Sequence, residues 1–109
     1  MQIIEQTIVA KRPDRKSEDG IVVTDDFVAV IDGSTSKSAQ RYSHSDSNGR
    51  YAMKLVARFV SHMPATTSCH QFCTGVTSLF SDTMCHRWLH HRRPLPDPVD
   101  RLAASAVIY

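Results

Sequence analysis

The chain has 109 residues, which is enough for one small domain and too few to bury two hydrophobic cores. With 41% hydrophobic and 22% charged residues, its composition is that of a folded globular protein rather than a disordered one. The net charge of +2 is too small to indicate nucleic-acid binding, and no apolar run approaches the roughly 20 residues that a membrane-spanning helix needs.

Cysteine usage indicates a reducing environment. The three cysteines, Cys69, Cys73 and Cys85, form an odd set, which argues against a secreted disulfide framework. The apolar N-terminal stretch carries Glu5 and lacks a small-residue cleavage site, so it is a poor signal peptide. We therefore expect a cytoplasmic protein with neither a membrane nor a nucleic acid as its partner.

The first third of the chain predicts three strands. Residues 3–10 are rich in β-branched side chains and predict a first strand, followed by a polar loop over residues 11–19. Residues 21–23 and 27–31 predict two more strands, joined as an antiparallel hairpin across residues 24–26. The last of these strands is almost wholly apolar, which predicts burial on both of its faces.

The middle of the chain predicts an exposed polar loop over residues 34–47 and then two helices. Asn48 is the expected N-cap of the first helix, and Pro64 ends it. Its apolar positions recur at helical spacing: Ala52, Leu55, Val56, Phe59 and Met63. A second helix is expected from about Thr67. Its buried side is expected to hold Phe72, Val76, Leu79, Phe80 and Thr83.

The last part of the chain predicts a connector and a strand. Three prolines between residues 92 and 98 predict a non-helical connector, and residues 103–109 predict a buried strand. A buried strand at the last residue favours a fragment whose sheet would continue, although the strand could also close the sheet. The expected fold class is α/β in the layered α+β sense, with residues 1–109 as one domain: a hairpin, two helices and a strand.

Acidic residues lie at the ends of the two hairpin strands. Glu18, Asp19 and Gly20 precede the first strand, while Asp32 and Gly33 end the second. A hairpin brings these positions to one end of the sheet, and paired carboxylates suit Mg²⁺ or Mn²⁺, which prefer oxygen ligands. The plainer interpretation is turn chemistry, because Asp-Gly is a common turn dipeptide.

This arrangement resembles the opening motifs of the PP2C family of metal-dependent serine/threonine protein phosphatases. In that family a Glu-Asp pair precedes two strands, and the second strand ends in Asp-Gly. The helix start at residues 48–52 and the small-residue segment 101–108 follow the family's order of elements. The resemblance covers most of this chain and the N-terminal part of the family's α/β/β/α sandwich.

The resemblance implies a role for each acidic residue. Asp32 would bridge two metal ions, Mg²⁺ or Mn²⁺, and the Gly33 carbonyl would bind one of them. Glu18 and Asp19 would hold metal-bound waters. The implied reaction is hydrolysis of phosphoserine or phosphothreonine in a phosphoprotein substrate by a water molecule that the metals activate.

The resemblance is incomplete at three places. The family usually follows Asp-Gly with His-Gly-Gly, whereas this chain has Ser34, Thr35 and Ser36. Asp14 stands where the family has its phosphate-binding arginine, so Arg15 or Arg12 would take that role. The family also needs two more metal-binding aspartates from later strands, and no later acid of this chain ends a strand in an Asp-Gly setting: Asp82, Asp97 and Asp100. We therefore expect weak metal affinity and little or no activity from this chain alone.

Two other hypotheses remain open. The chain could be a non-catalytic interaction module of the same fold, which binds a partner or forms a homo-oligomer through an open sheet edge, or binds through the basic segment 86–93. It could also be a small α/β domain with a structural zinc, since Cys69 and Cys73 are one helical turn apart, as are His86 and His90. Cysteines in an amphipathic helix also serve as small apolar residues.

Overall fold

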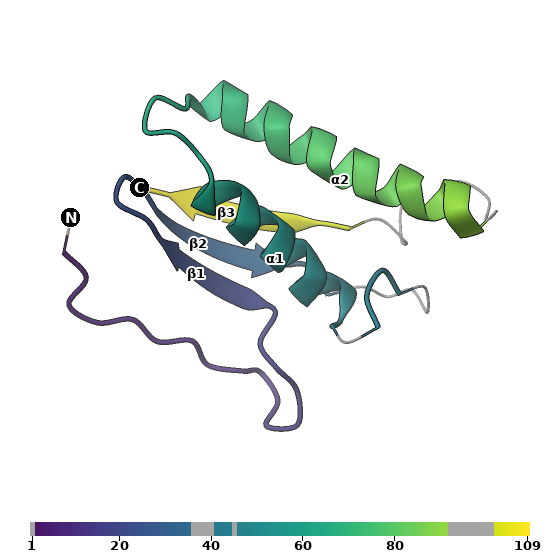
Figure 1. Cartoon of the computed structure of the whole chain (residues 1–109). Coiled ribbons are helices and arrows are strands. Elements are labelled where there is room, and N and C mark those ends of the chain that lie inside the picture. Colours follow the sequence, from purple (N-terminus) through teal and green to yellow (C-terminus); the bar gives the residue numbers. More distant parts are fainter. Residues whose placement is uncertain (1, 36–40, 45, 92–101) are drawn as a thin grey trace.

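A computed structural model describes residues 2–35, 41–44, 46–91 and 102–109, and it describes the side chains of the second helix up to residue 85. The chain has an α+β fold with a three-stranded antiparallel sheet of order β1-β2-β3 and two helices (Figure 1). The elements are β1 (Asp19–Val23), β2 (Val28–Gly33), α1 (Asn48–Ser61), α2 (Cys69–His91) and β3 (Ala104–Ile108). The predicted order of hairpin, two helices and strand is confirmed.

A two-residue turn joins β1 to β2. The Thr24 N–H donates to the Phe27 carbonyl over 2.8 Å, and the Phe27 N–H donates to the Thr24 hydroxyl over 2.9 Å. Asp25 and Asp26 form the exposed tip. These bonds fix the register of the hairpin, because the turn length decides which residues of the two strands face each other.

The described helices cover only one face of the sheet. Both helices lie on the same side of the sheet in Figure 1, and α1 contacts all three strands. Along β2, Ala29 and Ile31 are fully buried under α1, whereas Val30 between them is 47% exposed. The predicted burial of this strand on both faces is therefore wrong, because no described helix or strand packs on the far side.

The helix α1 supplies half of the buried apolar residues of the described core. Its buried apolar side chains are Ala52, Met53, Val56 and Val60. The N-cap is Ser47, whose hydroxyl accepts a hydrogen bond from the Arg50 N–H over 3.2 Å. The predicted N-cap, Asn48, is instead the first helical residue, and its side-chain oxygen accepts from the Tyr42 N–H.

The helix α2 packs on α1 through aromatic side chains. Phe72, Val76 and Phe80 contact the core as predicted, and the ring of Phe72 meets the ring of Phe59 edge to face at 5.8 Å. A reciprocal cap starts the helix: the Gln71 N–H donates to the Ser68 hydroxyl, and the Ser68 N–H donates to the Gln71 side-chain oxygen.

Three further predictions need correction. Residues 3–10 form no strand and are exposed, with Ile4 at 95% and Val9 at 76%, and they pair with none of the described strands. The loop before α1 is not wholly exposed, since Tyr42 and Asp46 are buried. The last strand is not buried throughout, because Val107 on the uncovered face is 54% exposed.

Several expectations fall outside the described residues. The proline-containing connector at residues 92–98 is one, and the acids Asp97 and Asp100 are others. Among the described helices, none has the length and apolar character needed to cross a membrane.

Candidate metal site

The two hairpin strands place Asp19 and Asp32 directly opposite each other. The Gly33 N–H donates to the Glu18 carbonyl over 3.0 Å, so the next pair along the ladder, Asp19 with Asp32, is a non-hydrogen-bonded pair. In such a pair the Cα atoms are about 4.5 Å apart and both side chains stand on the same face of the sheet. The hairpin thus brings two carboxylates side by side, as the sequence predicted.

This acid pair lies on the uncovered face. Asp32 is exposed and Asp19 is half-buried. On the other side of Asp32, the direct partner in β3 is Ser105, a small polar residue. Further along the same face, Val30 of β2 is paired with Val107 of β3, and both are exposed. Within the described part of the chain, no cluster of three or more His, Cys, Asp or Glu side chains could hold a metal ion.

Glu18 points away from the acid pair. One of its side-chain oxygens accepts a hydrogen bond from the Thr35 hydroxyl over 3.3 Å, and the other, Oε2, is buried with no partner among the described residues. That second oxygen lies against the backbone of Gly49, so a methyl group at Gly49 would collide with it. Glu18 therefore lies at the N-terminus of α1, where the helix dipole favours a negative charge.

Gly33 allows a close approach between β2 and α1. A methyl group at this position would collide with the Gly49 carbonyl oxygen and would lie 2.8 Å from the Glu18 carbonyl oxygen. The lack of a side chain is thus required by packing alone. The role of the Gly33 carbonyl as a metal ligand stays a prediction.

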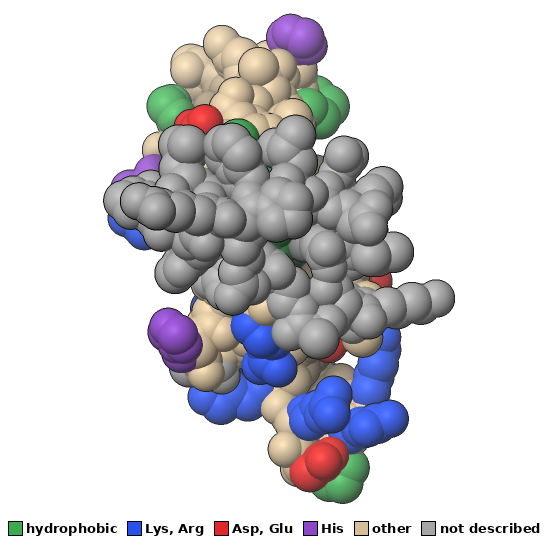
Figure 2. Space-filling view, turned by 90° about the vertical axis from the view of Figure 1, so that its right-hand side faces the viewer, with side chains coloured by type: hydrophobic (Ala, Val, Ile, Leu, Met, Phe, Trp, Pro, Cys, Tyr) green, Lys and Arg blue, Asp and Glu red, His purple; other side chains and the backbone are tan. Residues whose placement is uncertain are grey.

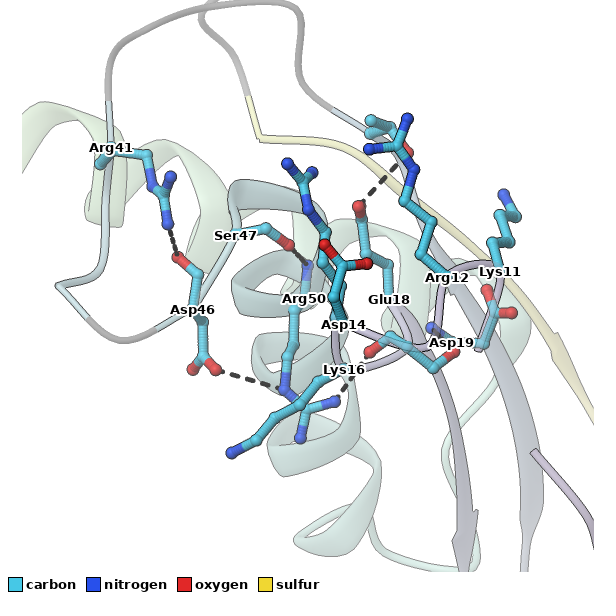
Figure 3. A pocket seen from close by; sticks show the side chains of 13 residues that line it. Lys11, Arg12, Asp14, Lys16, Glu18, Asp19, Arg41, Asp46, Ser47 and Arg50 are labelled. Atoms are coloured by element: carbon cyan, nitrogen blue, oxygen red, sulfur yellow. Dashed lines mark hydrogen bonds and ion pairs between the residues drawn. The ribbon is translucent and has the colours of Figure 1, made fainter. Parts of the chain in front are cut away.

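A pocket of about 630 Å³ opens beside the acid pair, between the segment before β1 and the start of α1 (Figure 3). Its lining includes Glu18, Asp19 and both predicted phosphate contacts, Arg15 and Arg12. Six basic and four acidic residues line it in all: Lys11, Arg12, Arg15, Lys16, Arg41 and Arg50, with Asp14, Glu18, Asp19 and Asp46. The structure thus brings the predicted arginines and one member of the acid pair to a common cavity.

Sequence reasoning missed the ion-pair cluster around Asp46. This buried carboxylate accepts from Lys54 over 2.8 Å and from Arg50 over 3.2 Å, and Arg50 also donates to the Ser17 carbonyl over 2.7 Å. The hydrogen bond from Lys54 lowers the pKa of Asp46 below its usual 3.8, and Arg50 acts in the same direction, against the opposing effect of burial. The helical spacing of Asp46 and Arg50, four residues apart, was the available signal.

The cysteines show no zinc site within the described residues. All three thiols are free and exposed. Reduced hydration raises the pKa of the Cys73 thiol, and the neighbouring Cys69 adds to this shift. Cys69 and Cys73 are thus close together, but the side chains of His86 and His90, which the zinc hypothesis needs, lie outside the described part.

Comparison of the chain with protein-family models, with curated proteins and with solved structures gives no match.

Proposed function

We propose that this chain supplies the metal-binding carboxylates of a PP2C-like, metal-dependent phosphoprotein phosphatase, with low activity on its own. The observation that supports this most is the direct pairing of Asp19 with Asp32 beside a pocket rich in arginine and lysine. Like charges directly opposite each other destabilise a sheet. A divalent cation between the two carboxylates would reverse that effect, so the pair favours a bound metal.

The donor set fits one Mg²⁺ or Mn²⁺ ion. Mg²⁺ usually keeps several water ligands and takes one or two carboxylates from the protein. Asp19 and Asp32 meet that need, while the described residues offer no third acidic, histidine or cysteine ligand beside them. A second ion would need further ligands. When bound, such a cation makes its water a stronger acid and offsets negative charge on a phosphoryl group.

Cation binding and phosphate binding would fall to different residues of the chain. Asp32 and Asp19 would hold the cation on the uncovered face of the sheet. Arg15 or Arg12, in the adjoining pocket, would donate to the phosphoryl oxygens, since the guanidinium group matches phosphate geometry. Phosphoserine or phosphothreonine of a protein would be the substrate, and the three free thiols agree with a reducing cytoplasm as the place of action.

Manganese binding and hydrolysis test this proposal together. We expect calorimetry to show one weakly bound Mn²⁺ per chain, and Mn²⁺ to be required for slow hydrolysis of p-nitrophenyl phosphate. Asp32→Asn should abolish both. Asp82→Asn is the matched control, because Asp82 is an exposed aspartate on α2, away from the sheet. If Asp32→Asn binds Mn²⁺ as well as the unmodified chain does, the proposal is wrong.

The free edges of the sheet favour a second function, a non-catalytic interaction module. Each of β1 and β3 pairs with β2 alone in the described sheet, so each presents an unpaired edge. Such edges recruit further strands, including those of a second copy. Light scattering would then show association that increases with concentration, and Val107→Lys on β3 would weaken it. Manganese binding without hydrolysis, together with this association, would favour the module over the enzyme.

A further inference from the structure

Basic side chains are concentrated in the segment that precedes β1. Four of the six residues from 11 to 16 are basic: Lys11, Arg12, Arg15 and Lys16. All four are exposed, and none forms an ion pair with another described residue. Asp14 is the only acid in this segment. Figure 2 shows lysine and arginine side chains gathered at the end of the molecule where this segment lies. We call residues 11–16 the basic turn.

A tight turn holds these charges together. The Arg15 N–H donates to the Arg12 carbonyl over 3.4 Å, so residues 12–15 form a four-residue turn with Pro13 at its second position. Proline favours that position because its ring fixes φ near the value the turn needs. The Cα atoms of Arg12 and Arg15 are then within about 7 Å of each other. The turn thus holds four basic side chains close together, with Asp14 as the one acid among residues 11–16.

The other basic residues of the pocket differ from the basic turn. Arg50 is held by Asp46 and by the Ser17 carbonyl, and Arg41 donates to the Asp46 carbonyl over 3.2 Å. These two arginines hold the loop before α1 in place. The four side chains of the basic turn form no ion pair within the described part of the chain, which leaves them available to an external anion.

The residues that line the pocket indicate which class of anionic ligand would bind the basic turn. Among the described residues, no aromatic side chain lines the cavity, whereas sites for single-stranded nucleic acid combine a basic groove with aromatic stacking platforms. Its four acids would also repel a continuous phosphate backbone. A peptide differs because its acidic side chains are separate and can lie beside the basic turn alone. The volume of about 630 Å³ is large enough for several such side chains.

We infer that the basic turn is a docking surface for an acidic peptide segment, so that the phosphatase would prefer phosphorylated residues with acidic neighbours. The inference rests on the proposed function and deepens it. Asp19 belongs both to the pocket lining and to the acid pair. A peptide whose acidic residues contact Lys11 and Lys16 would therefore present its phosphoryl group near Asp19 and Asp32.

Peptide binding tests this inference without catalysis. Fluorescein-labelled phosphoserine peptides with glutamate, alanine or lysine on both sides are titrated with the chain in a metal chelator, and anisotropy is measured. We expect the glutamate peptide to bind about tenfold more tightly than the alanine peptide, and the lysine peptide to bind most weakly. The preference should decrease with added salt, because salt screens exposed charges.

Charge reversal identifies the residues responsible. The double variant Lys11→Glu/Lys16→Glu should lose the preference for the glutamate peptide, and Lys11→Ala/Lys16→Ala should reduce it. Circular dichroism checks that both variants fold. Arg58→Glu is the matched control, since Arg58 is an exposed basic residue in the last turn of α1. It should leave the preference unchanged.

The outcomes separate the inference from the proposed function. Equal binding of the glutamate and alanine peptides overturns the inference, even if Mn²⁺-dependent hydrolysis is observed. Equally tight binding of a single-stranded oligonucleotide of the same charge also overturns it, because the turn would then be a general polyanion site. Selective binding of the glutamate peptide without any hydrolysis supports the docking surface and contradicts the phosphatase.

Discussion

The two faces of the sheet differ although they are made of alternating residues of the same strands. In β2, Ala29 and Ile31 face α1 and are fully buried, while Val30 and Asp32 face away from the helices and are exposed. The covered face accommodates only side chains that fill a fixed volume. The uncovered face accommodates a pair of like charges. The buried apolar side chains and the acid pair thus lie on opposite faces, and substitutions along β2 should differ in their effect on stability with a period of two.

The largest expected difference in unfolding free energy is between substitutions at two neighbouring residues of β2. Ile31→Ala should lower the free energy of unfolding by about 2–5 kcal/mol, because it leaves a cavity beneath α1. Val30→Ala, on the uncovered face, should change it by about 0.5 kcal/mol or less. Urea unfolding followed by circular dichroism measures both. Equal losses would show that the far face is covered in solution.

Two glycines on the covered face sharpen the comparison. Gly33→Ala should cost about 1–3 kcal/mol, because its methyl group meets backbone at Gly49, which cannot move freely. Gly20→Ala should cost less, since its methyl group meets the flexible side chain of Met53. Unfolding free energies of the two variants give the order. A greater loss at Gly20 would contradict the close contact between β2 and α1.

The acid pair should reduce stability in the absence of metal. Asp32→Asn removes the repulsion from Asp19 and should raise the free energy of unfolding by roughly 0.2–1 kcal/mol in a chelator at neutral pH. Added Mn²⁺ should raise the melting temperature of the unmodified chain and leave that of Asp32→Asn unchanged. A loss of stability in Asp32→Asn, with Asp82→Asn as the reference, would contradict the pairing.

The smallest expected effect on stability is the loss of the Asp46 ion pairs at acid pH. Asp46 has a lower pKa in the folded chain than its usual 3.8, so its ion pairs contribute fully above about pH 3.8 and are lost as pH falls through the folded pKa. Lys54→Met should therefore cost at most roughly 1 kcal/mol at neutral pH, and the cost should disappear at the lowest pH. Urea midpoints at several pH values, with Arg58→Met as control, measure this difference. A cost that stays constant with pH would assign the effect to packing of the lysine stem.

The sequence alone was sufficient to predict those elements whose structure is decided by local residue patterns. The hairpin follows from two apolar runs around a short acidic turn, and the helices follow from apolar residues at helical spacing. The burial of a strand was predicted less well, because an apolar run is compatible with one covered face or with two. Residues 3–10 show a similar limit: β-branched residues indicate a strand, but these residues pair with no described strand although β1 has a free edge.

Part of the candidate metal site could be predicted from the sequence. The meeting of Asp19 with Asp32 follows from hairpin topology. The separation of Glu18 from them follows from the alternation of side chains along a strand, because neighbouring residues point to opposite faces. The pocket beside them was not predictable, since it depends on how the segment before β1 and the loop before α1 come together in space. The Asp46 cluster depends on the same tertiary contact.

The length of the turn between Thr24 and Phe27 determines where the two acids point. One residue inserted there would slip β2 by a single position against β1, and every side chain of β2 would change sides. Asp32 would then face the apolar interior and Ile31 would face water. The placement of the carboxylates is therefore encoded at the opposite end of the hairpin, by the number of residues in the turn.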